Sequence, residues 1–546
     1  GRGESTEIGT FVERSVGHEM SGNIIDLCPV GALNNKPYRY RARSWEMTQH
    51  ATVSGHDCAG SNLFVHVVRG RVMRAVPRPE ESINETWLAD RDRYSCHGLY
   101  EEERVLEPMV RRDGEWRTAD WETALAAAAD ILRTAVRKSG PEALGFLAHP
   151  SSTLEEFALV AEVAAGLGSA NLDHRVHRVD FRDSASEAPV PGVGIPIAQV
   201  EQLDSLLLVG SRLRQEVPIL AHRVRKAALG GCKVSVLNPG SGEWLFPVHA
   251  EIVSGDHLVA DLAAILKAVS VRCDTTVAPG LAAAVDAAQP GPAHEAVAAS
   301  LGADSAVWLG LLAEVHPERA DLHAMGAELA RLTGARFGRL TVGANSAGAA
   351  LAGVQPHRGA GGVERDKFGL DVRAMQQEGL DALLMLNLEP EDFSEAPDAF
   401  LQATRVVALT PFASEALLDC ADVILPTGTF LETSGTFVNC EGRWQSFSGA
   451  VGPPGEARPA WKVLRVLGNL LELDGLLYDD TDQVRAALEC VLEGAPAGKP
   501  DAPDRTLAVP ASAGVASPVA LYGVDALVRR SEPLQKASAL AGGPGS

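Results

Sequence analysis

Ser21-Gly-Asn-Ile-Ile-Asp-Leu-Cys28-Pro-Val-Gly-Ala-Leu33 is the stretch on which the interpretation of this sequence depends. In ferredoxin-type domains a run of iron–sulfur ligands ends in Cys-Pro, and that last cysteine often serves a cluster whose other ligands lie elsewhere. Proline fixes φ and removes one backbone donor, so the chain turns away just after Cys28. No Cys-x-x-Cys occurs anywhere in the sequence. Cys28 is therefore either one ligand of a shared [4Fe–4S] cluster or an ordinary buried thiol.

The bulk properties restrict the class of protein. A chain of 546 residues with 46% hydrophobic content can form several domains with large cores. The formal charge of -22 argues against nucleic acid or an anionic membrane surface as a direct partner. The longest apolar runs, such as Ala382–Leu388, are far shorter than the roughly 20 residues of a membrane span. Eight dispersed cysteines favour a reducing compartment, so we expect a cytoplasmic protein without direct membrane insertion.

From Trp121 onward, apolar strands and amphipathic helices alternate, which is typical of βαβ units and a parallel sheet covered on both faces. The expected strands are Ala143–Ala148, Ser205–Gly210 and Cys232–Leu237, and the expected helices are Ala124–Arg137, Leu154–Gly166 and Val217–Leu229. Residues 258–332 look helical, with few strand signals. The strands Asp381–Leu388 and Arg405–Leu409 predict a second α/β unit. Residues 491–519 have the composition of a flexible tail.

Ligands of open α/β sheets bind at the carboxyl ends of the strands, near the point where the strand order reverses. The loops at His149, Ser211, Asn238 and Leu388 follow predicted strands. We therefore expect these loops to surround one crevice.

A small β-rich domain precedes this region. The runs Asn62–His66 and Arg71–Val76 around Arg69-Gly70 predict a β-hairpin. Next to it, His56, Cys58, Cys96 and His97 have the side-chain types of a two-His, two-Cys zinc site. Neither His-x-Cys nor the adjacent Cys-His has the usual spacing of a structural zinc site, so thiols packed in a core are the preferred interpretation.

The sequence resembles the large iron–sulfur subunit of respiratory NADH–quinone oxidoreductase (complex I), within the molybdopterin oxidoreductase superfamily. The resemblance runs through residues 1–33 and 36–46, and it resumes further along the chain. The later segments are Asn84–Tyr94, Glu432–Arg458 and Leu521–Arg530. In that family the cysteine of Cys-Pro-Val-Gly-Ala-Leu is the fourth ligand of a [4Fe–4S] cluster, and this role carries over to Cys28 alone.

The resemblance implies that the other three ligands precede Gly1 and that the chain is N-terminally truncated. Further [4Fe–4S] and [2Fe–2S] clusters are expected in the missing part. The implied activity is that of a peripheral-arm subunit of proton-translocating NADH:quinone oxidoreductase, which passes electrons from NADH and FMN toward quinone. The implied partners are the flavin and NADH-binding subunits and the cluster subunits, on the cytoplasmic side of the bacterial inner membrane. No complete active site is expected on this chain.

The implied fold class is α/β. Residues 1–40 would be the tail of a ferredoxin-like cluster domain and 41–105 a small β-rich domain of the [4Fe–4S] Mo/W bis-MGD type. Residues 106–490 would form a molybdopterin-oxidoreductase-like body with Rossmann-like parallel sheets, and 491–546 a flexible tail with a C-terminal docking segment.

Relatives of the small domain bind a second [4Fe–4S] cluster through four cysteines. The corresponding positions here are Gly55, Cys58, Asn62 and Cys96, so two of the four thiolates are missing. We therefore expect this cluster to be lost.

The alternative is a catalytically active molybdopterin-dependent oxidoreductase of the formate dehydrogenase type. Such relatives supply a cysteine or selenocysteine to the metal within a segment that matches Asn171–Asp180 here. Val179 takes the ligand position, with Asp180 beside it, and no cysteine occurs between Cys96 and Cys232. We therefore expect no bound molybdopterin. A nicotinamide-dependent dehydrogenase is disfavoured because no dinucleotide fingerprint follows any predicted strand.

Overall fold

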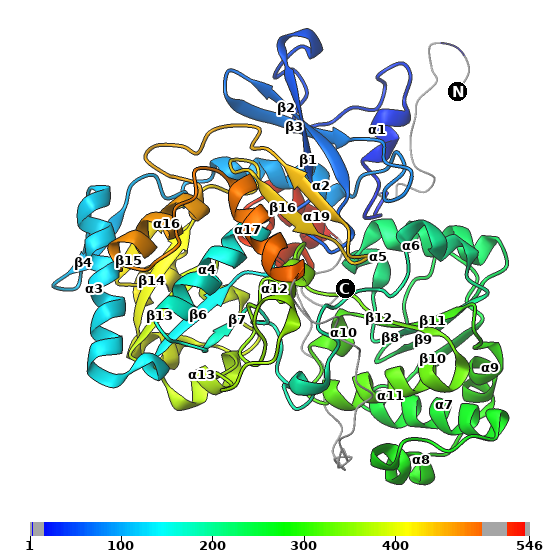
Figure 1. The fold of residues 1–546 in the computed structure, drawn as a ribbon. Helices are drawn as coiled ribbons and strands as arrows, with labels where there is room; N and C mark the ends of the chain where they lie inside the picture. Colours follow the sequence, from blue (N-terminus) through cyan, green and yellow to red (C-terminus); the bar gives the residue numbers. More distant parts are fainter. Residues whose placement is uncertain (1–2, 4–15, 494–520, 541–546) are drawn as a thin grey trace.

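The described chain contains two large sheets, one of them entirely parallel, and two small antiparallel sheets, one of three strands and one formed by β16 (Gly435–Val438) and β17 (Trp444–Phe447) (Figure 1). The structure, a computed structural model, describes Gly3, residues 16–493 and residues 521–540. Figure 1 shows the small β-rich domain above two α/β units, one containing the cyan and yellow elements and the other the green ones. The predicted α/β class is therefore confirmed.

The first α/β unit contains a seven-stranded sheet in the order β5-β4-β15-β14-β13-β6-β7. Its parallel strands are β7 (Leu172–Asp173), β6 (Leu144–Ala148), β13 (Ala382–Leu386), β14 (Arg405–Thr410) and β15 (Val423–Pro426). The hairpin β4 (Met109–Arg112) and β5 (Glu115–Thr118) adds an antiparallel edge. The strand order reverses between β6 and β13, which pair directly although more than 200 residues separate them.

The second α/β unit is inserted between β7 and β13. Its five parallel strands are β10 (Ala250–Val253), β9 (Lys233–Asn238), β8 (Ser205–Val209), β11 (Ser305–Leu309) and β12 (Arg336–Arg339), in this spatial order. The expected division into units was therefore wrong, because β6 pairs with β13 and not with β8. The expectation of a mainly helical 258–332 region also missed β11. That strand is buried on both faces, so it has no polar–apolar alternation to reveal it.

The observed helices agree better than the strand pairing does with the prediction from the sequence. The helix α3 spans Trp121–Ser139, α4 spans Leu154–Gly166 and α6 spans Pro218–Leu229. The hydroxyl of Thr153 caps α4 by accepting a hydrogen bond from the amide of Glu156, and the Glu156 carboxylate accepts one from the amide of Thr153. This reciprocal box fixes the start of the helix. The helices α7 (Leu258–Cys273) and α11 (Arg319–Thr333) pack on each other and on the second sheet.

In the small domain, β1 (Thr48–Val53), β2 (Asn62–Val68) and β3 (Arg71–Pro77) form an antiparallel sheet. The predicted hairpin is confirmed, and its turn places Arg69 and Gly70 at φ 49° and 75°. Two positive φ angles in succession are typical of the tight turns that match the twist of paired strands. The helix α2 (Asp90–Tyr94) and the 3-10 helix η4 (Ser95–Tyr100) follow this sheet.

The C-terminal residues return to the centre of the molecule. The 3-10 helix η11 (Leu521–Gly523), α18 (Ala526–Arg529) and α19 (Glu532–Leu540) pack against α2 and η4. Most of the predicted flexible tail lies outside the described residues, and residues 491–493 belong to α17 (Thr481–Glu493). Among the described helices, none is both long and apolar enough to cross a bilayer.

Candidate cluster ligand and the filled strand-end crevices

Cys28 lies at the end of the short helix α1 (Asn23–Leu27), and its side chain is partly exposed. The amide of Leu33 donates a hydrogen bond to its sulfur at 3.5 Å. Hydrogen bonds from the backbone amides of Leu33 and Val30, with smaller contributions from Ala32 and Gly31, lower the pKa of the Cys28 thiol. This loop therefore favours the thiolate, which is the form that ligates iron.

The loop around Cys28 is attached to α2. Asp90 accepts hydrogen bonds from the Ser21 hydroxyl at 2.6 Å and from the Gly22 amide at 2.7 Å. Arg93, which is almost fully buried, pairs with Asp26 at 2.5 Å. Asn23 is buried and exchanges hydrogen bonds with the backbone of Leu88 at 2.7 Å and 3.0 Å, whereas Leu27 is 64% exposed and Val30 is 81% exposed. The face that carries Cys28 therefore has room for ligands from outside the described residues.

The four positions of the second cluster do not form a metal site. Cys58 and Cys96 belong to different hydrophobic clusters. The Cys440 amide donates to the Cys58 carbonyl at 2.7 Å, and contact with the Cys58 side chain raises the pKa of the Cys440 thiol well above its usual value. At Gly55, an added Cβ would meet the ring of Phe430 at 3.0 Å. The residues present therefore do not fit a [4Fe–4S] cluster.

The zinc alternative is not supported either. The two ring nitrogens of His56 are engaged by Asp525 and by the Ser95 hydroxyl, each at 2.7 Å. Burial raises the pKa of the Cys96 thiol to about 12, which keeps it protonated. Across Gly3, residues 16–493 and residues 521–540, no three side chains of His, Cys, Asp or Glu gather as a metal site.

The first crevice lies at the carboxyl ends of β6 and β13, where the order of the first sheet reverses. The C-terminal segment fills it. His149, in the loop after β6, is in contact with the Val524 carbonyl at 3.3 Å. Glu389, in the loop after β13, accepts hydrogen bonds from Arg529 at 2.8 Å and from Arg530 at 2.7 Å. All of these groups are buried or nearly so, so the crevice holds a peptide segment of this chain.

The second crevice lies at the carboxyl ends of β8 and β11, where the order of the second sheet reverses. A carboxylate of the chain occupies it. Glu216 accepts hydrogen bonds from the amide of Arg212 at 2.6 Å, the amide of Leu311 at 3.3 Å and the hydroxyl of Ser211 at 2.9 Å. Burial raises the pKa of Glu216 to about 7, although these donors oppose the shift. The carboxylate therefore lies where the amides of both strand-end loops could otherwise hold an external anion.

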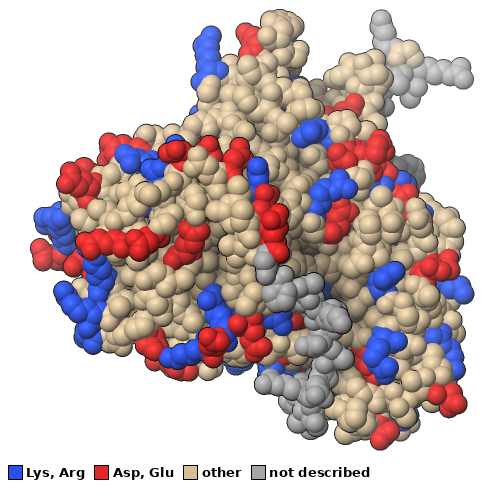
Figure 2. Space-filling view, in the orientation of Figure 1, with Lys and Arg blue, Asp and Glu red and all other residues tan. Residues whose placement is uncertain are grey.

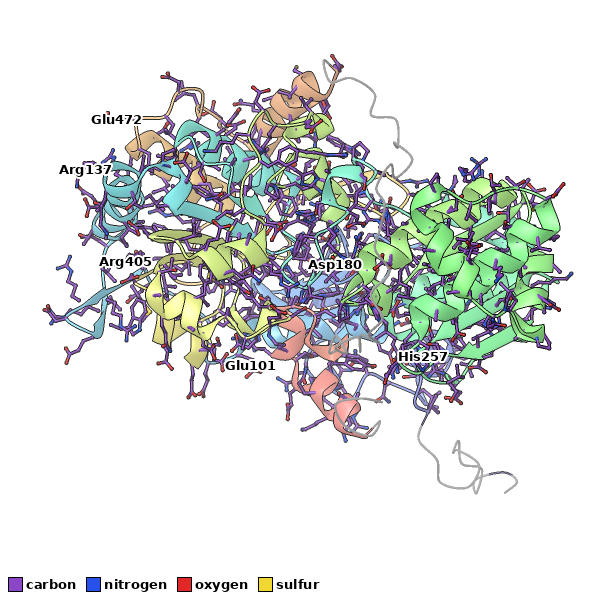
Figure 3. The ribbon with its side chains drawn as sticks, turned by 90° about the horizontal axis from the view of Figure 1, so that it is seen from below. Glu101, Arg137, Asp180, His257, Arg405 and Glu472 are labelled. Carbon is purple, nitrogen blue, oxygen red and sulfur yellow. The ribbon has the colours of Figure 1, made fainter. Side chains whose placement is uncertain are left out.

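Buried charges fill the space between the two units. The ion pairs join Arg178 to Asp183 at 2.5 Å, Arg319 to Asp183 at 2.7 Å, Arg319 to Glu314 at 3.1 Å and Arg339 to Glu187 at 3.4 Å. Asp180, which is adjacent to the expected metal-ligand position Val179, accepts hydrogen bonds from Arg182 and from the Ala320 amide. Figure 3 shows Asp180 at the junction of the two units.

The cavity left between the units has a volume of about 60 Å³ and is lined by residues that include His174, His177 and Arg178. Sites for cofactors and other small molecules typically measure roughly 300–1,000 Å³. Room for a few water molecules therefore remains, and a pterin cofactor does not fit between these residues.

Sequence reasoning found the right strand ends but not their arrangement. The four loops surround two crevices rather than one, with His149 and Leu388 at the first and Ser211 and Asn238 at the second. Glu216, Glu389 and Asp525 were missed because a carboxylate gives no sign in the sequence of the distant groups that it will meet. A larger cavity of about 1370 Å³ was also missed. It lies between residues 17–41, the loop after β9 and α19, and the sequence does not show that these distant segments come together.

Comparisons with known proteins identify the family of the chain. The family model "Molybdopterin oxidoreductase" matches residues 104–470, which is more than half of the chain. The chain therefore belongs to the molybdopterin oxidoreductase family. Two further models match shorter parts: "NADH-quinone oxidoreductase subunit 3, ferredoxin-like domain" at residues 1–34 and "NADH-ubiquinone oxidoreductase NDSU1/NuoG-like, 4Fe-4S domain" at residues 47–97.

Its relatives within this family are subunits of NADH oxidoreductases. The NADH-ubiquinone oxidoreductase 78 kDa subunit of Neurospora crassa is 30% identical over 506 residues, covering 89% of this chain and 60% of that protein. An NADH-quinone oxidoreductase subunit of Rickettsia felis is 28% identical over 501 residues, covering 89% of this chain and 65% of that protein. This chain thus spans less than two thirds of either relative's length.

Among solved structures, acetylene hydratase from Pelobacter acetylenicus superposes with a TM-score of 0.60 over 79% of this chain and 70% of that one. The sequences are 15% identical, so this similarity establishes the fold alone.

Proposed function

We propose that this chain is a peripheral-arm subunit of an NADH–quinone oxidoreductase. The relatives from Neurospora crassa and Rickettsia felis are subunits of such complexes, and each similarity covers 89% of this chain. In this proposal electrons from NADH and FMN pass through iron–sulfur clusters toward quinone, and the flavin, NADH-binding and cluster subunits are the partners. The proposed location is the cytoplasmic side of the bacterial inner membrane.

Cys28 is the ligand that this chain contributes to a [4Fe–4S] cluster in the proposal. The observation that carries this role is the set of amides around its sulfur, with Leu33 at 3.5 Å. When bound, such a cluster supplies one-electron transfer. Hydrogen bonds from the amides of Leu33 and Val30 lower the pKa of the Cys28 thiol, and hydrogen bonds to ligand sulfur are a main determinant of cluster potential. The ion pair of Arg93 with Asp26 keeps the helix before Cys28 in place.

The α/β body has a structural role in this proposal, as the support on which neighbouring subunits dock. The alternative, a molybdopterin-dependent enzyme of the formate dehydrogenase type, is less well supported. Glu216 fills one strand-end crevice and Arg529 with Arg530 fill the other, and Val179 stands at the expected ligand position.

The test is a Cys28→Ser substitution introduced in the source organism, with Cys490→Ser as the matched control because Cys490 is exposed on α17. Membranes from both strains are reduced with NADH and examined by EPR. We expect one tetranuclear cluster signal to disappear or change in Cys28→Ser and all signals to persist in the control. An unchanged spectrum together with unchanged quinone reduction would contradict the role of Cys28.

Elemental analysis separates the two functional classes. The proposal expects iron and no stoichiometric molybdenum or tungsten in the purified complex, together with copurification of the flavin subunit. One molybdenum or tungsten atom per chain would instead support the catalytic alternative.

A further inference from the structure

The segment Lys36–Trp45 alternates cations and aromatic rings in a way that the proposed function does not explain. It reads Lys-Pro-Tyr-Arg-Tyr-Arg-Ala-Arg-Ser-Trp, so four cations and three aromatic residues occur in ten positions without a carboxylate. The chain as a whole has a formal charge of -22, and acidic and basic side chains are interspersed over the face in Figure 2. This segment therefore differs sharply in charge from the chain as a whole.

Two of the three aromatic rings of this segment, those of Tyr40 and Trp45, are exposed. Tyr40 is 94% exposed and Trp45 is 80% exposed. Arg39 lies over the ring of Tyr40 at 5.1 Å and Arg43 over the ring of Trp45 at 5.9 Å. Exposed rings covered only by arginines bury little apolar surface within the chain, so they contribute little to its own folding.

The four cations are exposed as well. Within the part of the chain that the structure describes, none of Lys36, Arg39, Arg41 and Arg43 takes part in an ion pair. The guanidinium groups thus present their donors to the outside, where a planar carboxylate can accept two hydrogen bonds from one arginine.

The segment is nevertheless held in one shape. The buried side chain of Asn35 accepts a hydrogen bond from the Tyr38 amide at 3.3 Å, and the Tyr38 hydroxyl donates to the Ala42 carbonyl at 2.8 Å. Arg74 of β3 lies over the Tyr38 ring at 4.7 Å. Glu46 accepts a hydrogen bond from the Arg43 amide at 2.9 Å.

Tyr40 has a left-handed backbone with φ 67°, a conformation that is disfavoured for a residue other than glycine. The chain thus places a large ring in a conformation that glycine would adopt more readily, with the ring pointing outward. The Arg41 amide closes this turn by donating a hydrogen bond to the Tyr38 carbonyl at 3.0 Å, and the turn leaves the Tyr40 ring exposed.

We propose that Lys36–Trp45 is a docking surface for an acidic patch on another protein, and in the context of the proposed function this partner is a neighbouring subunit of the oxidoreductase. Tyrosine, tryptophan and arginine are the residues that contribute most to binding energy at protein interfaces. A local carboxylate-rich patch suits four unpaired cations, whereas a long polyanion would be repelled by the acidity of the rest of the chain.

The first test is a charge reversal, Arg39→Glu with Arg41→Glu and Arg43→Glu, in the complex purified from membranes. The matched control reverses three exposed arginines elsewhere, Arg112, Arg117 and Arg137. We expect at least about tenfold less flavin subunit per chain in the triple variant at physiological salt and unchanged stoichiometry in the control. Equal retention in both variants would overturn the inference.

The second test exploits the strain at Tyr40. Tyr40→Gly should leave the isolated chain as stable as wild type or more stable, since glycine accepts φ 67° without strain, yet it should weaken retention of the partner. Glu472, whose φ is 61°, provides the control substitution Glu472→Gly, which should relieve strain without affecting retention. If Tyr40→Gly destabilised the chain and left retention unchanged, the ring would have a purely structural role.

A photo-crosslinking amino acid in place of Tyr40 identifies the occupant. We expect a crosslink to an acidic peptide of another polypeptide in the assembled complex. A crosslink to this chain, to a second copy of it or to no protein would overturn the inference. These outcomes are separable from a failure of the proposed function, in which the wild-type chain would not copurify with any flavin subunit.

Discussion

The imidazole Nδ1 of His56 lies 2.7 Å from the carboxylate of Asp525, 469 residues further along the chain. The contact joins the small β-rich domain to the C-terminal segment that fills the first crevice. Burial alone would lower the pKa of His56, but the charge of Asp525, its hydrogen bond and the charge of Asp92 together outweigh burial and raise the pKa. Burial would raise the pKa of Asp525, and His56 instead holds it well below its usual range.

This pair predicts a pH window for docking of the C-terminal segment. The contribution of Asp525 is present above its unfolded pKa of about 3.9 and is lost as the pH falls toward the folded value. The contribution of His56 is complete below its unfolded pKa of about 6.5 and is lost as the pH rises through the raised folded value. Protection of the backbone amides of the C-terminal segment against hydrogen exchange should therefore be greatest between about pH 4 and 6.5. Hydrogen exchange of residues 521–540, corrected for intrinsic rates, measures it.

Asp525→Asn isolates the charge, because asparagine can still cap α18 through the amides of Leu527 and Val528. We expect about 2 kcal/mol less local protection at pH 6 and a smaller difference at pH 9. A pH-independent difference would show that the charge of the pair does not anchor the segment.

Glu216 predicts that the second unit becomes less stable as the pH rises toward 7. Its folded pKa of about 7 lies above the unfolded value, so its contribution is complete at low pH and is lost as the pH rises toward 7. Glu216→Gln removes this titration. Relative to wild type, the melting temperature of the variant should rise between pH 5 and pH 8. A constant difference over that range would mean that Glu216 does not titrate there.

The cysteines should differ in reactivity toward iodoacetamide in the cluster-free chain. Backbone amides lower the pKa of Cys28, whereas burial raises the pKa of Cys96 to about 12. We expect Cys28 to be alkylated faster than the exposed Cys490 at pH 7, and Cys96 only after unfolding. Mass spectrometry of quenched time points gives the three rates. Alkylation of Cys28 at or below the rate of Cys490 would argue against a stabilised thiolate.

Trp308 on β11 tests the interior strand that periodicity did not reveal. The side chain is fully buried and its indole nitrogen donates to the Val193 carbonyl at 3.0 Å. Trp308→Ala should cost about 3–5 kcal/mol through the cavity and the unsatisfied carbonyl. Leu477→Ala is the control, because Leu477 is 82% exposed and should change stability by less than about 0.5 kcal/mol. Thermal unfolding of the variants compares the two.

Local signals in the sequence predicted local structure well. The bounds of α4 follow from the Thr153 cap and its reciprocal partner Glu156, and the turn at Arg69-Gly70 follows from the residues themselves. The pairing of β6 with β13 could not be predicted, because strands buried on both faces have nearly the same apolar pattern and any two of them could be neighbours.

The same limit applied to the candidate site. The motif indicated Cys28, and the foremost amide donor to its sulfur, Leu33, lies only five residues further along the chain. The carboxylate of Glu389 meets Arg530 across 141 residues, and no spacing in the sequence encodes such an encounter.

The groups that fill both crevices are covalent parts of the polypeptide. A fold held together by a dissociable ligand gains stability with the logarithm of the free ligand concentration. Here Glu216 and Arg529 are present at one equivalent per chain in every cell and at every dilution. Occupancy of both crevices therefore does not depend on the concentration of any free ligand.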